Sequence, residues 1–126
     1  LVHSKAVASS SHADALEEKL KRTQLWDVFA PHVYSTDLVA HAKPAPDIFL
    51  YAADKLGVAP SACLVFEDSV NGVRAASAAG MRVWGFAGGG HMDGNSSGRL
   101  LAAGVERVVD HWDAALPLIA QLGSSA

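Results

Sequence analysis

The sequence predicts an α/β fold in which a mostly parallel sheet forms the centre of a Rossmann-like three-layer sandwich. Short apolar or β-branched runs alternate along the 126 residues with longer segments of helical periodicity, and this alternation is typical of βαβ units. Residues 63–66 (Cys-Leu-Val-Phe) form an uninterrupted apolar run, as expected for a strand buried on both faces. Half of the residues are hydrophobic, so the chain can bury a core as one domain.

The beginning of the chain is predicted to hold two strands and a helix. Residues 5–8 are expected to end a first strand, and residues 32–35 to form a second. Between them, Ser11 and Asp14 fit a capping box with Ser11 as the N-cap, which predicts a helix over residues 12–22.

Two further helices have recognisable ends. Pro46 suits the first turn of a helix because its fixed φ is already helical, and Gly57 is placed to end that helix at its C′ position. Ser69 is expected to cap the next helix, which Gly80 should end.

The last third of the chain is predicted to add two strands and a helix. The strands are expected over residues 82–86 and 105–110, and the helix over residues 113–121. The glycines at 88–90 and from 94 to 98 indicate a flexible loop between the two strands.

Composition narrows the possible functions. The net charge is −3 and no block of consecutive basic residues occurs, which argues against nucleic-acid binding. No apolar run approaches the roughly 18 residues of a membrane span. The chain has one cysteine and can form no internal disulfide, which is compatible with a reducing cytoplasm. A cytoplasmic protein with no nucleic-acid or membrane partner is therefore expected, as a monomer or weak dimer.

Polar clusters follow three of the predicted strands, at the sheet edge where ligands of parallel sheets bind. Ser9, Ser10 and Ser11 lead into a helix N-terminus, where hydroxyls and backbone amides can hold a phosphate. Taken alone, a serine before a helix is more often only a cap.

The other two clusters carry opposite charges. Lys43 is followed by Pro-Ala-Pro, so it is held before a helix and can neutralise a phosphoryl group. Glu67 and Asp68 directly follow the apolar strand, and carboxylate oxygens suit Mg²⁺. A solvated lysine and an aspartate that caps the next helix are the plainer alternatives.

Together these clusters resemble three motifs of the haloacid dehalogenase superfamily. The segment K-P-A-P-D-I-F (residues 43–49), followed by F-E-D-S-V-N-G-V-R-A-A-S-A-A-G-M (residues 66–81), is similar to its branch of β-phosphoglucomutase-like enzymes and small-metabolite phosphatases. The resemblance extends from Lys5 to about Ile119.

This resemblance implies a Mg²⁺-dependent hydrolase that dephosphorylates small phosphorylated metabolites through an aspartyl-phosphate. It implies that Ser9, with Ser10, binds the transferring phosphoryl group and that Lys43 neutralises both the nucleophile and the phosphate. It further implies that Glu67 and Asp68 bind Mg²⁺, with Asp68 as the more direct ligand. A β-phosphoglucomutase-type phosphomutase is the alternative, whereas the acid pair argues against a metal-free 2-haloacid dehalogenase.

One expected motif does not occur in the sequence. No Asp-x-Asp run lies anywhere in these residues, although the resemblance implies that such a run carries the nucleophile. We therefore expect residues 1–126 to be a partial core domain that lacks the first strand and the cap domain. That strand would lie beside the strand ending at Phe66, so its absence should leave two unpaired edges and an apolar slot. A non-catalytic remnant of the fold is a further alternative.

Overall fold

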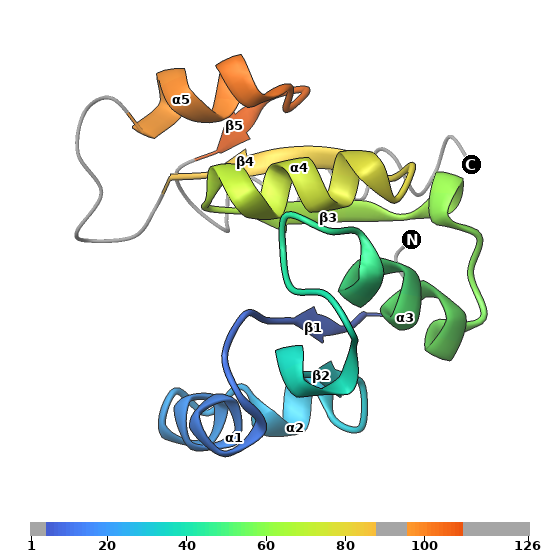
Figure 1. Cartoon of the computed structure of the whole chain (residues 1–126). Helices are drawn as coiled ribbons and strands as arrows, with labels where there is room; N and C mark the ends of the chain where they lie inside the picture. Colours follow the sequence, from blue (N-terminus) through green and yellow to red (C-terminus); the bar gives the residue numbers. More distant parts are fainter. Residues whose placement is uncertain (1–4, 88–95, 110–126) are drawn as a thin grey trace.

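The computed structural model describes residues 5–87 and 96–109, and its elements alternate between strands and helices (Figure 1). In chain order they are β1 (Val7–Ala8), α1 (Ala13–Arg22), α2 (Trp26–Phe29), β2 (Val33–Tyr34), α3 (Asp47–Leu56), β3 (Leu64–Glu67), α4 (Val70–Ala78), β4 (Arg82–Phe86), α5 (Ser96–Ala103) and β5 (Val108–Val109). Two short 3₁₀ helices, Thr36–Leu38 and Pro60–Ala62, lie in the connections.

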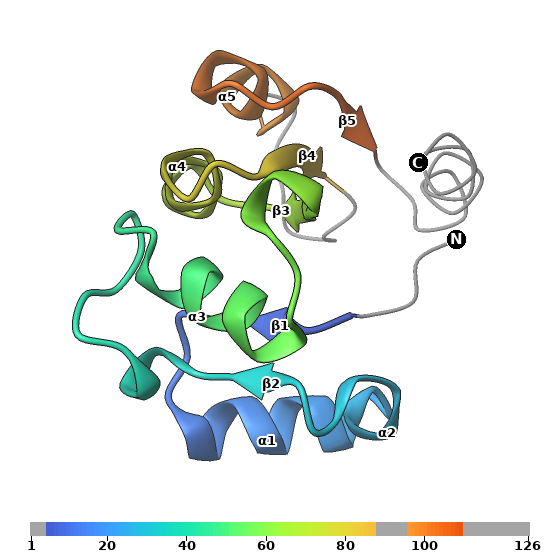
Figure 2. The ribbon, with the colours of Figure 1, turned by 90° about the vertical axis from the view of Figure 1, so that its right-hand side faces the viewer.

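The strands form two parallel sheets, which confirms the predicted α/β class. One sheet has the order β1-β2 and the other β3-β4-β5, and all three strand pairs are parallel. Figure 2 shows the strands in one column, with β1 next after β3 and with α3, α4 and α5 on one side. Among the described residues β1 pairs only with β2, and β3 only with β4.

Side-chain alternation in β3 explains why its first three residues are all apolar. Val65 is 9% exposed and packs into the large core cluster with residues of α3 and α4. Leu64 and Phe66 pack instead against the cluster around Trp84. One face of β3 is therefore buried in the core, and the other is half-buried, so apolar residues suit both faces of the strand.

Helices α3, α4 and α5, which lie on one side of the strands, share one core. The most deeply buried large side chains are Ile48 of α3, Val73 of α4 and Leu100 of α5. They belong to one continuous cluster that also takes in Tyr34 of β2. Because this cluster spans elements of both sheets, burial of apolar surface holds the two sheets in a fixed relationship.

Several local predictions are confirmed. β4 has the predicted bounds, Arg82–Phe86. The Ser69 hydroxyl accepts a hydrogen bond from the backbone N–H of Gly72, so Ser69 caps α4 as expected. Gly57 follows α3 with a φ of +70°, in the left-handed region that favours glycine at the C-terminus of a helix.

The predicted capping box at Ser11 is wrong. α1 begins at Ala13, its N-cap is His12, and no side chain of the N-cap residue forms a capping bond. Instead, the backbone N–H of Ala13 donates to the carboxylate of Asp37, at 3.2 and 3.3 Å from its two oxygens. A distant acid thus satisfies the helix N-terminus, and no short-range pattern could indicate it.

Other boundaries also differ. The glycine-rich loop expected to extend to Gly98 ends earlier, because α5 begins at Ser96. The strand predicted over residues 105–110 is β5, Val108–Val109, and the helix predicted over residues 113–121 lies outside the described residues. No described helix is long and apolar enough to cross a membrane.

Candidate active site

The predicted site residues lie around one cavity of about 820 Å³ between the ends of β1 and β3. Ser9, Ser10, Lys43, Glu67 and Asp68 all line it. Its remaining walls come from β1, α1, the start of α4 and the end of β4: Val7, Ala8, Ser11, Leu16, Lys19, Leu20, Phe66, Ser69, Val70, Asn71 and Phe86. The fold therefore brings together three clusters that are far apart in the sequence.

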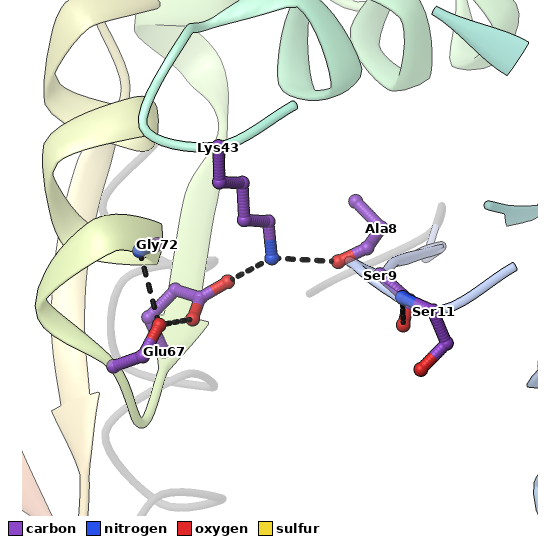
Figure 3. Close-up of polar contacts among 7 residues, drawn as sticks. Ala8, Ser9, Ser11, Lys43, Glu67 and Gly72 are labelled. Atoms are coloured by element: carbon purple, nitrogen blue, oxygen red, sulfur yellow. Dashed lines mark hydrogen bonds and ion pairs between the residues drawn. The ribbon is translucent and has the colours of Figure 1, made fainter. Parts of the chain in front are cut away.

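Lys43 reaches from the loop before α3 to both sheets (Figure 3). Its Nζ donates to the backbone carbonyl of Ala8 at 3.0 Å and to Oε2 of Glu67 at 2.6 Å. The stem lies near Phe49, with Nζ 5.0 Å from the ring centroid. The alternative of a solvated lysine is excluded, because the side chain is only 8% exposed.

Glu67 is the buried partner of this lysine. Its side chain is also 8% exposed, and the Ser69 hydroxyl donates to Oε1 at 3.3 Å. Desolvation of two charges is costly, but hydrogen bonds to both carboxylate oxygens offset it. The Glu67 carboxylate thus accepts hydrogen bonds from Lys43 and Ser69. Its role as a metal ligand stays a prediction.

Asp68 differs from its neighbour because it is exposed to solvent and lines the cavity. It does not cap α4, since Ser69 fills that position. Mg²⁺ is commonly held by one or two carboxylates together with waters and substrate phosphate, so Asp68 fits one such ligand. Residues 5–87 and 96–109 contain no group of three or more His, Cys, Asp or Glu side chains that could hold a metal.

The serines lie where β1 leads into α1. The Ser9 hydroxyl accepts a hydrogen bond from the backbone N–H of Ser11 at 3.0 Å, so its own hydrogen stays available for another acceptor. Ser9 is half-buried and Ser10 is exposed. All three serines of this loop line the same cavity as the acid pair.

Asp37 restricts what the N-terminus of α1 can bind. Burial alone would raise the pKa of Asp37. Hydrogen bonds from its own backbone N–H, from Ala13 and from Ser35, together with nearby His12, lower it overall. Nδ1 of His12 lies 3.5 Å from this carboxylate. An anionic side chain already occupies the helix terminus, which leaves hydroxyl groups, more than the helix dipole, as the groups that the Ser9 loop can offer an anion.

Two residues of this region were not found from the sequence. Asp37 is 24 residues away from Ala13, and no local signal links them. Gly72 lies inside α4 against Glu67, because a Cβ built on it would overlap the Glu67 carboxylate. A glycine within a predicted helix was the available signal, since it usually has a packing or functional reason.

The fold and this arrangement agree with a family assignment. The model of the haloacid dehalogenase-like hydrolase family matches residues 3–80, more than half of the chain. The chain therefore belongs to the haloacid dehalogenase-like hydrolases, as its motifs indicated.

Two curated relatives and one solved structure show which proteins this chain is similar to. A probable pseudouridine-5'-phosphatase of Drosophila melanogaster is 51% identical over 61% of this chain and 36% of its own length. The fructose-1-phosphate phosphatase YqaB of Escherichia coli is 45% identical over 60% of this chain and 40% of its own length. A haloacid-dehalogenase-like protein of Agrobacterium tumefaciens superposes with a TM-score of 0.91 at 41% identity, over 98% of this chain and 56% of that one.

The coverage of these relatives is partial. The chain spans well under half the length of the two phosphatases and slightly more than half of the Agrobacterium protein. Both of these curated relatives are named as phosphatases of small phosphorylated metabolites.

Proposed function

We propose that these residues form the charge-binding part of a Mg²⁺-dependent phosphatase that acts on small phosphorylated metabolites through an aspartyl-phosphate. The observation that carries the proposal is the meeting of Ser9, Lys43 and Asp68 around one cavity. These three residues come from separate parts of the chain, and each offers a group that phosphoryl transfer needs. Phosphate monoesters of sugars are the favoured substrate class, because the relatives act on pseudouridine 5'-phosphate and fructose 1-phosphate by name.

The chain's own residues bind and neutralise charge. Lys43 offers an ammonium group that is already fixed by two hydrogen bonds, so it can stabilise developing negative charge without reorganising. The Ser9 hydroxyl can donate to a phosphoryl oxygen. Asp68 would hold Mg²⁺, which when bound screens the negative charge that otherwise keeps an anionic nucleophile away from a phosphate.

The nucleophile must come from outside these residues in this proposal. Among the described residues, β1 and β3 each have one side without a strand partner, and residues of both line the cavity. Both strands run in the same direction in Figure 1. A parallel strand placed between them would pair with both and would join the two sheets into one. Its carboxyl end would then lie beside Lys43 and Asp68, where an aspartate could attack phosphorus while the ester oxygen leaves.

The experiment is a phosphate-release assay with and without Mg²⁺, on a panel of sugar and nucleoside monophosphates. The proposal predicts that a protein carrying an upstream Asp-x-Asp segment releases phosphate only with Mg²⁺, and that the 126-residue chain alone does not. A phosphomutase would instead convert one sugar phosphate isomer into another. Absence of both reactions from the longer protein would favour the non-catalytic alternative.

A further inference from the structure

We propose that Gly72 and Ser69 are positioning residues for Lys43, acting through Glu67. The N-terminal turn of α4 forms a seat for the Glu67 carboxylate, and the seated carboxylate fixes the lysine ammonium at the cavity (Figure 3). We call this set of contacts, from Gly72 and Ser69 to Glu67 and Lys43, the glutamate seat. The seat follows from the contacts alone, whereas its consequence for catalysis rests on the proposed function.

The seat depends on a missing side chain at Gly72. A Cβ at this position would overlap Oε1 and Cδ of Glu67, and these atoms belong to a buried carboxylate that Lys43 and Ser69 hold by hydrogen bonds. The main chain of α4 itself would have to shift, or Glu67 would have to leave. Glycine weakens a helix relative to alanine, so the close approach of the carboxylate is a physical reason for glycine here.

Ser69 completes the seat with one hydroxyl group. Its Oγ accepts the backbone N–H of Gly72 at 3.0 Å and donates to Oε1 of Glu67 at 3.3 Å. The residue therefore caps α4 and orients the carboxylate at once. With Oε1 fixed by Ser69, Oε2 is directed at Lys43.

As a result, the Lys43 ammonium group keeps one N–H that can still donate a hydrogen bond. Of its three N–H groups, one donates to Ala8 and one to Glu67, so the third can be donated to an anion in the cavity. This arrangement separates the two adjacent acids: Glu67 is buried and serves the lysine, while Asp68 is exposed at the cavity. Glu67 is thus assigned an indirect role, through Lys43.

The test measures how accessible Lys43 is, by the rate at which an amine-acylating reagent modifies it in the 126-residue chain. Exposed Lys55 provides the internal reference, and peptide mass spectrometry resolves the two sites. In the native chain Lys43 should react much more slowly than Lys55. Gly72→Ala should raise the Lys43 rate at least about tenfold, because access to a buried ion pair requires its opening.

Gly98→Ala is the matched control, since Gly98 also lies in a helix and a Cβ there meets nothing within 4 Å. It should leave the Lys43 rate unchanged. Ser69→Gly is the second variant, because glycine is tolerated as an N-cap while the hydroxyl to Glu67 is lost. Ser69→Gly should raise the rate of Lys43 acylation by less than Gly72→Ala does. It also allows the inference to be tested if Gly72→Ala fails to fold.

A double variant separates the seat from a general loss of stability. With Glu67→Ala already in place, adding Gly72→Ala should leave the Lys43 rate unchanged, because no carboxylate is left to displace. An equal rise in both backgrounds would overturn the inference, as would a Lys43 that stays protected in Gly72→Ala and Ser69→Gly. If the seat is confirmed and no phosphatase activity is found in the longer protein, the proposed function fails while the seat stands. In an active enzyme, Gly72→Ala should lower kcat with less effect on KM.

Discussion

Nζ of Lys43 lies 2.6 Å from Oε2 of Glu67, and both side chains are only 8% exposed. The same ammonium group donates to Ala8 at the end of β1, while Glu67 ends β3. One buried ion pair therefore connects the edges of two sheets that do not pair with each other among the described residues. The pair has a structural role and, under the proposed function, a chemical one, and the two can be measured separately.

Lys43→Ala should destabilise the fold strongly, because it leaves the Glu67 carboxylate buried without its partner. Loss of one member of a buried pair costs about 3–5 kcal/mol. Urea unfolding of the 126-residue chain measures this loss directly. Lys55→Ala is the control, since Lys55 is exposed and its ammonium group lies over the Tyr51 ring, with no ion pair to a carboxylate among the described residues.

Removing both charges should cost less than removing one. Lys43→Met combined with Glu67→Gln keeps similar volumes and leaves no unpaired buried charge, so part of the lost stability should return. A double variant that is as unstable as the sum of its single changes would show that the two residues do not interact.

Asp68→Asn should have little effect on stability, because the side chain is exposed and makes no capping contact. In an active form of the enzyme it should raise the Mg²⁺ concentration needed for half-maximal activity. A Mg²⁺ titration of phosphate release measures this shift. Asp54→Asn is the control, because Asp54 is exposed on α3, and it should alter neither the stability nor the Mg²⁺ requirement. An unchanged Mg²⁺ requirement in Asp68→Asn would show that Asp68 is not a metal ligand.

Asp37 should make the stability of the chain depend on pH. The pKa of Asp37 is lowered in the folded state, so its carboxylate contributes stability above its ordinary value of 3.8, and this contribution is lost as pH falls through the folded-state value. Asp37→Asn should therefore lower Tm at neutral pH, and its difference from the native chain should shrink in acid. A difference that grows as pH falls would contradict this account. Thermal unfolding followed by circular dichroism at several pH values measures it.

Ser9→Ala should weaken substrate binding more than Ser10→Ala in an active enzyme. Ser9 is half-buried and its oxygen is oriented by the N–H of Ser11, whereas Ser10 is exposed. Steady-state kinetics should show the larger fall in kcat/KM for Ser9→Ala. Equal effects of the two changes would show that the hydroxyl of Ser9 has no special place in the site.

Features with short-range causes were predictable from the sequence. The left-handed conformation of Gly57 and the cap at Ser69 follow from residues within one turn of a helix. The motifs at Lys43 and at Glu67 with Asp68 located the site, because parallel strands bring their carboxyl ends to one edge. The same reasoning identified the family and named Asp68 as the more direct Mg²⁺ ligand, but it did not predict that Glu67 pairs with Lys43.

Features that depend on distant partners were not predictable. Asp37 replaces the expected Ser11 cap because the chain returns from β2 to the start of α1. The helical start at Ser96 was not predicted because Gly98 lies in the first turns of α5, and the cost of a glycine in a helix is offset once Leu100 is buried. Burial likewise decides that Glu67 meets Lys43 while Asp68 stays exposed, and no spacing in the sequence encodes that difference.

The central claim is that Lys43 and Asp68 act on the same phosphoryl group. The most direct test is kcat/KM for a sugar phosphate, measured in an active form of the enzyme for Lys43→Ala and Asp68→Ala against the controls Lys55→Ala and Asp54→Ala. Each site variant should lose about 2–4 kcal/mol of transition-state stabilisation, and each control should lose almost none. An active enzyme in which both site variants retain the native kcat/KM would contradict the account.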